Sequence, residues 1–112
     1  MGKIIVVTKR CYLEDETSKD IDIFTNDTGK KLRIYRILYT GGVRDSAELN
    51  VYLKIGEMKV FPYEGSLYNI GGTTWVDADI ELDPNSTLKL HYDNNTTTTF
   101  DTVIVIVAEV VE

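Results

Sequence analysis

The segment from Trp75 to Asp83 carries the residues with the clearest potential for chemistry. It reads Trp-Val-Asp-Ala-Asp-Ile-Glu-Leu-Asp, so apolar and acidic residues alternate along it. In an extended strand, alternate side chains point to opposite faces, and neighbours on one face lie about 6.5–7 Å apart. The pattern therefore predicts that Trp75, Asp77, Asp79 and Glu81 share one face and form a ladder of negative charge beside an aromatic ring.

Three kinds of binding are open to this ladder. Its carboxylates could help to hold a hard cation such as Ca²⁺, but a straight strand cannot wrap around an ion that takes about six to eight oxygens, so we predict no metal site and no cofactor. They could pair with a basic partner, including region 30–36 of a neighbouring copy. Trp75 could instead stack on a sugar. A solvated strand face whose charges discourage aggregation has the same pattern.

Tyrosines mark a second candidate surface. In segment 31–40 we place Leu32, Ile34 and Leu38 in the core, which leaves an outward set of Arg33, Tyr35, Ile37 and Tyr39. In segment 47–55 strict alternation directs Val51 and Leu53 to one face and Tyr52 to the other, outward one. Segment 87–92 alternates in the same way, with Leu88 and Leu90 on its apolar face. Because Tyr and Arg are enriched in protein interfaces, we predict that Tyr35, Tyr39 and Tyr52 contribute to one. Amphipathic covering of a sheet explains the same residues equally well.

The residue types needed for catalysis are scarce. His91 is the only histidine and Cys11 the only cysteine, which is too few for a zinc site built on these residue types. The sequence has no nucleophile elbow, and the glycine pairs at 41–42 and 71–72 are typical of turns rather than of phosphate-binding loops. We therefore predict no catalytic residues and no enzymatic activity.

The elements that must position these residues are strands. Short runs rich in Val, Ile, Thr and Tyr alternate with period two and are separated by Gly, Asn and Asp. The predicted strands span 3–13, 20–25, 31–40, 47–55, 58–63, 66–70, 75–82, 87–92 and 102–111. We predict an all-β fold: a single-domain antiparallel β-sandwich of about eight strands over residues 1–112, or a small barrel.

The first and last strands are apolar on both faces. In the last strand Val103, Val105 and Val107 lie on one side, and Ile104 and Ile106 lie on the other; residues 4–7 repeat the pattern. A two-layer sandwich buries one face of each sheet, so an outer apolar face would remain exposed. We predict that another subunit covers it, with Ile104 and Ile106 in the interface. A crossing loop or a central barrel strand is the alternative.

The charge and composition of the chain limit the kinds of partner that it can bind. The net charge is −6, divided into +2 over residues 1–60 and −8 over residues 61–112. This balance argues against nucleic-acid binding, which needs a basic face. The longest apolar run, 103–108, is too short to span a membrane, and the amino-terminal segment has no signal-peptide pattern. Because a single cysteine cannot form an intramolecular disulfide and no signal-peptide pattern is present, we expect synthesis in the cytoplasm. Glycosylation requires the secretory route, so we interpret the sequons as residues that form turns; they lie at Asn26, Asn85, Asn94 and Asn95.

One segment carries a resemblance. The turn and strand Asp83-Pro84-Asn85-Ser86-Thr87-Leu88-Lys89-Leu90, followed by a polar loop and a valine-rich strand, resembles the closing hairpin of small jelly-roll-like sandwiches in accessory virion proteins. These are head-decoration, fibre and baseplate modules of tailed phages and related viruses; carbohydrate-binding sandwiches share the pattern. The resemblance implies a module that forms homo-oligomers or docks on a larger assembly such as a virion. A carbohydrate-binding sandwich that uses Trp75 and neighbouring Asp and Asn residues is the alternative.

Overall fold

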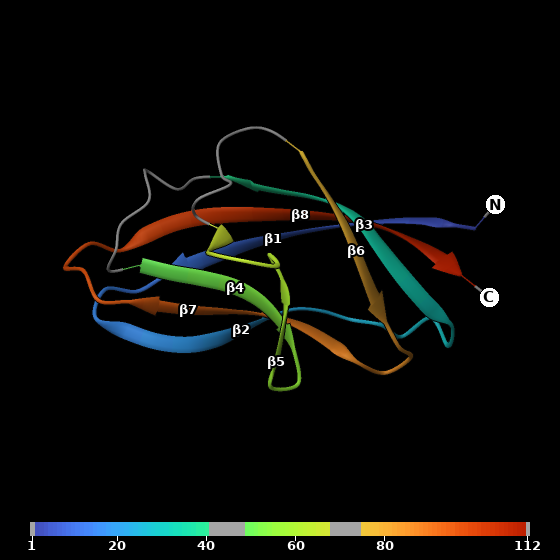
Figure 1. The fold of residues 1–112 in the computed structure, drawn as a ribbon, viewed down its shortest axis with the longest axis horizontal. Coiled ribbons are helices and arrows are strands. Elements are labelled where there is room, and N and C mark those ends of the chain that lie inside the picture. Colours follow the sequence, from blue (N-terminus) through green and yellow to red (C-terminus); the bar gives the residue numbers. More distant parts are fainter. Residues whose placement is uncertain (1, 41–48, 68–74, 112) are drawn as a thin grey trace.

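Eight strands make up the elements of the fold. The computed structural model describes residues 2–40, 49–67 and 75–111 (Figure 1). The strands are β1 (Ile4–Leu13), β2 (Thr17–Thr25), β3 (Lys31–Thr40), β4 (Leu49–Ile55), β5 (Met58–Phe61), β6 (Val76–Leu82), β7 (Thr87–Asn94) and β8 (Phe100–Val111). The prediction of an all-β chain of about eight strands is confirmed.

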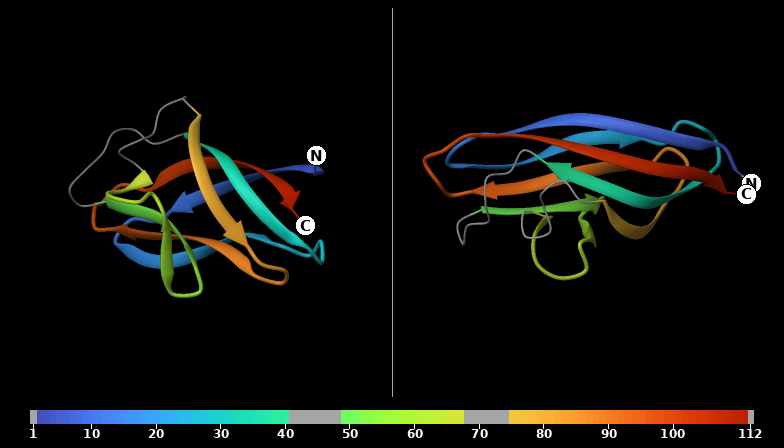
Figure 2. Two further views of the ribbon diagram at one scale, coloured as in Figure 1. Left: turned by 45° about the vertical axis from the view of Figure 1, so that its right-hand side comes forward. Right: turned by 90° about the horizontal axis from the view of Figure 1, so that it is seen from above.

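The strands form two antiparallel sheets packed face to face. Sheet A has the order β1-β8-β3-β6 and sheet B the order β2-β7-β4-β5. The pairs β1·β8, β2·β7, β3·β6 and β4·β5 are those of one long hairpin folded over on itself, which is the jelly-roll form of the β-sandwich. The two ends of the described chain lie side by side (Figures 1 and 2), where the Val110 N–H donates to the Lys3 carbonyl oxygen at 2.9 Å.

Some strands begin or end at other residues than predicted, because hydrogen-bonded pairing with a neighbouring strand sets their ends. β2 begins three residues earlier because Thr17 pairs with Asn94, although its first residues are polar. β5 ends before Pro62, which has no N–H for a ladder. Ser66, predicted in a strand, instead donates its hydroxyl to the Val51 carbonyl at 3.1 Å. Residues 47–48 and 68–70 of the predicted strands, and the predicted turns at 41–42 and 71–72, lie outside the described residues.

The core lies between the sheets and follows the alternation expected from the sequence. In β4, Leu49, Val51 and Leu53 are buried, and in β7, Leu88 and Leu90 are buried. Burial of each such side chain contributes about 1.5–3 kcal/mol. Both strands carry polar side chains on their outer face, as expected for sheets with one solvated side.

A β-bulge in β3 changes which residues of that strand face the core. The pairing register of β3 with both β6 and β8 shifts between Ile34 and Arg36. Because β3 has one residue more than β8 at this point, at Tyr35, the side chains beyond it exchange faces. Ile37 and Tyr39 are therefore buried, with 1% and 4% of their surface exposed, and Leu38 lies on the outer side, half-buried. The prediction that Tyr39 faces outward is wrong.

The two faces of β8 are also reversed relative to the prediction. Ile104 and Ile106 are buried in the core of this chain, with 0% and 1% exposed, so they are not on its outer face. The half-buried outer residues are Val103, Val105 and Val107. Period-two alternation separates the two sets, but it does not say which set turns inward.

A buried asparagine closes the turn from β2 to β3. The Asn26 side chain is 0% exposed, and its Nδ2 donates to the carbonyls of Lys30 at 2.7 Å and Leu82 at 2.9 Å. Its Oδ1 accepts from the Thr28 N–H at 3.1 Å and from the Thr28 hydroxyl at 2.7 Å. The side chain thus satisfies backbone groups where the chain crosses from sheet B to sheet A.

The turn from β7 to β8 repeats this arrangement. Asn94, also 0% exposed, donates from Nδ2 to the carbonyls of Thr98 at 2.9 Å and Leu13 at 3.1 Å. Its Oδ1 accepts from the N–H and the hydroxyl of Thr96. The sequence patterns at Asn26 and Asn94 therefore serve as turn chemistry. Each turn also joins two distant parts of the chain. The Asn26 turn is hydrogen-bonded to Leu82 at the end of β6, and the Asn94 turn is hydrogen-bonded to Leu13 at the end of β1.

Candidate functional site

The acidic ladder lies along β6, the edge strand of sheet A. Asp77, Asp79 and Glu81 are exposed and alternate with inward residues such as Ile80, which is 4% exposed. Trp75 directly precedes the strand and has 42% of its surface exposed. The three carboxylates therefore share the outer side of sheet A, as the alternation predicts.

Basic residues of the same chain lie next to the ladder. In β3, Arg33 Nη1 lies 3.7 Å from Asp79 Oδ1, and Lys31 Nζ lies 3.4 Å from Glu81 Oε1. Arg33 also donates to Glu109 Oε1 at 3.0 Å, and this hydrogen bond is the main cause that raises the pKa of Arg33. These side chains are largely exposed, so water screens the pairs. The basic first half and the acidic second half of the sequence are thus interleaved within one sheet.

The spacing of the ladder keeps its carboxylates apart. Within the described residues, no group of three or more His, Cys, Asp or Glu side chains is arranged to hold a metal ion. Neighbours on one strand face lie about 6.5–7 Å apart, too far for a single cation to bridge several of them.

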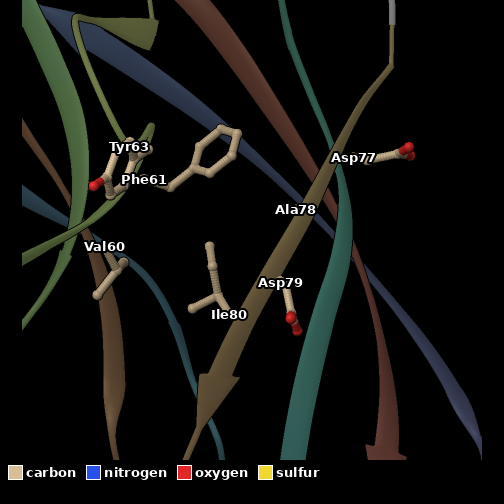
Figure 3. A pocket seen from close by; sticks show the side chains of 7 residues that line it. All are labelled: Val60, Phe61, Tyr63, Asp77, Ala78, Asp79 and Ile80. Carbon is tan, nitrogen blue, oxygen red and sulfur yellow. The ribbon is translucent and has the colours of Figure 1, made fainter.

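An apolar cleft opens on the opposite side of β6, between β6 and β5. Its volume is about 460 Å³, and it is lined by Val60, Phe61, Tyr63, Asp77, Ala78, Asp79 and Ile80. Figure 3 shows that Phe61 and Ile80 project to one side of the β6 ribbon, whereas Asp77 and Asp79 project to the other. Trp75 is not among the lining residues, so the predicted ring and carboxylates do not converge on this cleft. The sequence carried no signal for it, because the cleft depends on how the two sheet edges meet.

A polar network crosses the outer face of sheet B, and sequence reasoning did not identify it. The side chains of β2, β4 and β7 meet there: His91 Nδ1 lies 2.7 Å from Asp20 Oδ1, and Lys54 Nζ lies 3.0 Å from Asp20 Oδ2. His91 Nε2 lies 3.4 Å from Asp93 Oδ2. Burial opposes ionisation of Asp20, but hydrogen bonds from His91 and Lys54 outweigh it and lower the pKa of this carboxyl. Both ring nitrogens of His91 therefore face carboxylates, which fixes the ring.

Two of the predicted interface tyrosines lie on outer faces. The Tyr52 ring is half-buried, 5.0 Å from the His91 ring, and Lys59 Nζ lies 5.5 Å from its centroid. Tyr35, at the bulge of β3, is half-buried with the Arg33 guanidinium 5.7 Å from its ring. Both rings are covered by neighbours of their own sheet, and their contact with a partner stays a prediction.

The single thiol lies in the core. Cys11 is 0% exposed, and burial raises its pKa to about 11. A thiol with this pKa remains protonated near neutral pH, and the protonated form is a poor nucleophile. Cys11 thus behaves as a small apolar core residue.

An apolar stripe runs diagonally over the outer face of sheet A. We call it the outer stripe; its residues are Ile4, Val6, Leu38, Val103, Val105 and Val107. The register places Val6 beside Val107 and Val105 beside Leu38, so the side chains are neighbours across β1, β8 and β3. Ile4 and Val6 have 47% and 61% of their surfaces exposed.

Three surfaces in the described part of the chain could bind a partner: the outer stripe, the acidic ladder on β6, and the cleft between β6 and β5. No helix among the described residues has the length and apolar character needed to cross a membrane. Comparison with models of protein families, with curated proteins and with solved structures found no match for this chain.

Proposed function

We propose that this chain is a non-enzymatic assembly module that binds other protein subunits, foremost copies of itself, through the outer stripe. The observation that carries the proposal is the exposure of Ile4 and Val6 beside the half-buried valines of β8. Contiguous apolar surface in contact with water is unfavourable, and such patches mark protein contact sites. A second subunit on sheet A would remove this surface from water.

Charged pairs at the two ends of the outer stripe would orient the partner. At one end Arg10 donates to both carboxylate oxygens of Asp101, at 2.8 and 2.6 Å, and this hydrogen bonding lowers the pKa of Asp101. At the other end Arg33 pairs with Glu109. An apolar centre with a polar rim is the usual anatomy of a protein interface, and charges in the rim favour one orientation.

The setting that we propose is a large regular assembly such as a virion, where the module would decorate or join subunits. The jelly-roll fold supports this setting, since capsid domains use it, although lectin domains use it as well. Closed or repeating symmetry would let one surface be used by every copy.

Size-exclusion chromatography with light scattering tests the proposal. At tens of micromolar we expect a species larger than the 12.7 kDa monomer, and we expect Val6→Asp to shift it to the monomer. The matched control is Met58→Asp, which changes another exposed apolar residue, 69% exposed, in β5 of sheet B. A wild-type chain that stays monomeric, or equal dissociation by both variants, would contradict self-association through the outer stripe.

Carbohydrate binding at Trp75 is the alternative, favoured by the exposure of its indole ring. A glycan array compares the wild-type chain with Trp75→Ala. Binding that disappears in the variant supports this alternative; no binding by the wild-type chain removes it.

A further inference from the structure

Within residues 2–40, 49–67 and 75–111, strand β6 is paired along one edge, and we call its other edge the free edge. Among the described strands it is hydrogen-bonded to β3 only, and its other side faces β5 across the apolar cleft. An edge strand presents N–H and C=O groups that can pair with an added strand. The free edge of β6 is a separate surface from the outer stripe, so a strand can pair with it whether or not the outer stripe is covered.

The pairing of β6 with β3 shows which residues pack well against each face of β6. On the outer side, Arg33 and Arg36 of β3 stand opposite Glu81 and Asp77. On the inner side, apolar residues stand opposite apolar residues: Leu32 with Leu82, Ile34 with Ile80, and Ile37 with Val76. A strand that alternates basic and apolar residues is therefore complementary to β6 on both faces.

The free edge offers the same two environments. On the outer side, the carboxylates of Asp79 and Glu81 have 79% and 64% of their side-chain surface exposed, so they are accessible to a further cation. On the inner side, the cleft presents Phe61 and Ile80. Because side chains of an added strand alternate between the same two faces, basic residues would meet the carboxylates and apolar residues would enter the cleft.

We propose that the free edge of β6 binds an extended segment of a partner protein in which basic and apolar residues alternate. The segment adds a strand to sheet A; main-chain hydrogen bonds hold it, and the two faces of β6 select its side chains. The cleft is shallow, and apolar side chains of the segment would cover Phe61 and Ile80 there. The same carboxylates repel a second β6 edge, so they disfavour pairing of two identical edges.

The probe that tests this proposal is a capped peptide that copies residues 31–37, Lys-Leu-Arg-Ile-Tyr-Arg-Ile. We expect it to bind the full chain in isothermal titration calorimetry, with an affinity that falls as salt rises. We expect NMR shifts and slowed amide exchange to concentrate on residues 76–82. The control peptide replaces the three basic residues by Glu and is expected not to bind.

Two triple variants distinguish the effect of the β6 carboxylates on peptide binding from the effect of the net charge of the chain. In Asp77→Asn/Asp79→Asn/Glu81→Gln we expect about tenfold weaker binding of the peptide, since three exposed ion pairs together carry roughly the free energy of one decade in Kd. The triple variant Asp22→Asn/Asp27→Asn/Glu57→Gln changes net charge equally at exposed positions elsewhere and is expected to bind as the wild-type chain does.

Several results would overturn the proposal: no binding of the peptide, shifts that map away from β6, or equal weakening in both triple variants. Circular dichroism and thermal melting of each variant establish that it is folded before titration. Val6→Asp is expected to bind the peptide normally, so a failure of self-association through the outer stripe and a failure of edge binding remain distinguishable.

Discussion

Replacement of Asn26 by Ala tests whether the buried asparagine turns hold the two sheets together. The side chain makes four hydrogen bonds: two from Nδ2 to the carbonyls of Lys30 and Leu82, and two to Oδ1 from Thr28. The groups of Lys30 and Thr28 lie beside solvent and can turn to water, whereas the hydrogen bond to Leu82 is buried. An unsatisfied buried carbonyl costs about 1–3 kcal/mol and each other lost bond roughly 0.5–1 kcal/mol.

We therefore expect Asn26→Ala to lower the free energy of unfolding by about 2.5–6 kcal/mol. For a chain of 112 residues this corresponds to a fall in Tm of roughly 10–25 °C. Urea titration followed by circular dichroism measures the free energy, and calorimetry measures Tm. The control is Asn95→Ala, an exposed position in the equivalent turn, which is expected to change stability by less than about 0.5 kcal/mol. A loss in Asn26→Ala no larger than in the control would refute the reasoning.

Three further predictions concern the core, the polar network and the thiol. Ile106→Ala is expected to cost about 2–5 kcal/mol in urea unfolding, and Val107→Ala, on the outer side, clearly less; equal losses would contradict the assigned faces. The pKa of Asp20 is lower in the folded state than in the unfolded state. The ionised Asp20 therefore stabilises the fold above its unfolded pKa of about 3.9, and this stabilisation is lost as the pH falls through its pKa in the folded state. The stability advantage of the wild-type chain over Asp20→Asn should thus shrink in acid; an advantage that grows below about pH 4 would be inconsistent. Maleimide should label Cys11 at pH 8 only in the unfolded chain, and rapid labelling of the native chain would show that the thiol is not buried as described.

The sequence predicted those parts of the fold that depend on local pattern. Alternation located the buried faces of β4 and β7, and the alternating acids of β6 were correctly placed on one exposed face. The bulge at Tyr35 was not predictable, because it arises where β3 must match two neighbours at once. It reversed the faces of all residues beyond it, including Tyr39.

The candidate sites depended more strongly on tertiary structure. The acidic ladder could be read from residues 75–83, but its pairing with Arg33 required knowledge that β3 lies next to β6. The network around Asp20 joins residues that are 71 positions apart in the case of His91. No periodic pattern encodes a contact of that range, since it is set by the order of strands in the sheet.

The pairing of β1 with β8 has a consequence for the biogenesis of this protein. The outer stripe is assembled mainly from the first and the last of the described strands, with Val6 beside Val107. During synthesis β1 must wait, unpaired and apolar, until β8 has left the ribosome. The surface that we propose for assembly is therefore complete only after β8 has been translated and has paired, so a chain that still lacks β8 is unable to enter the assembly through it. The interval before β8 emerges is also the period in which β1 is most exposed to aggregation.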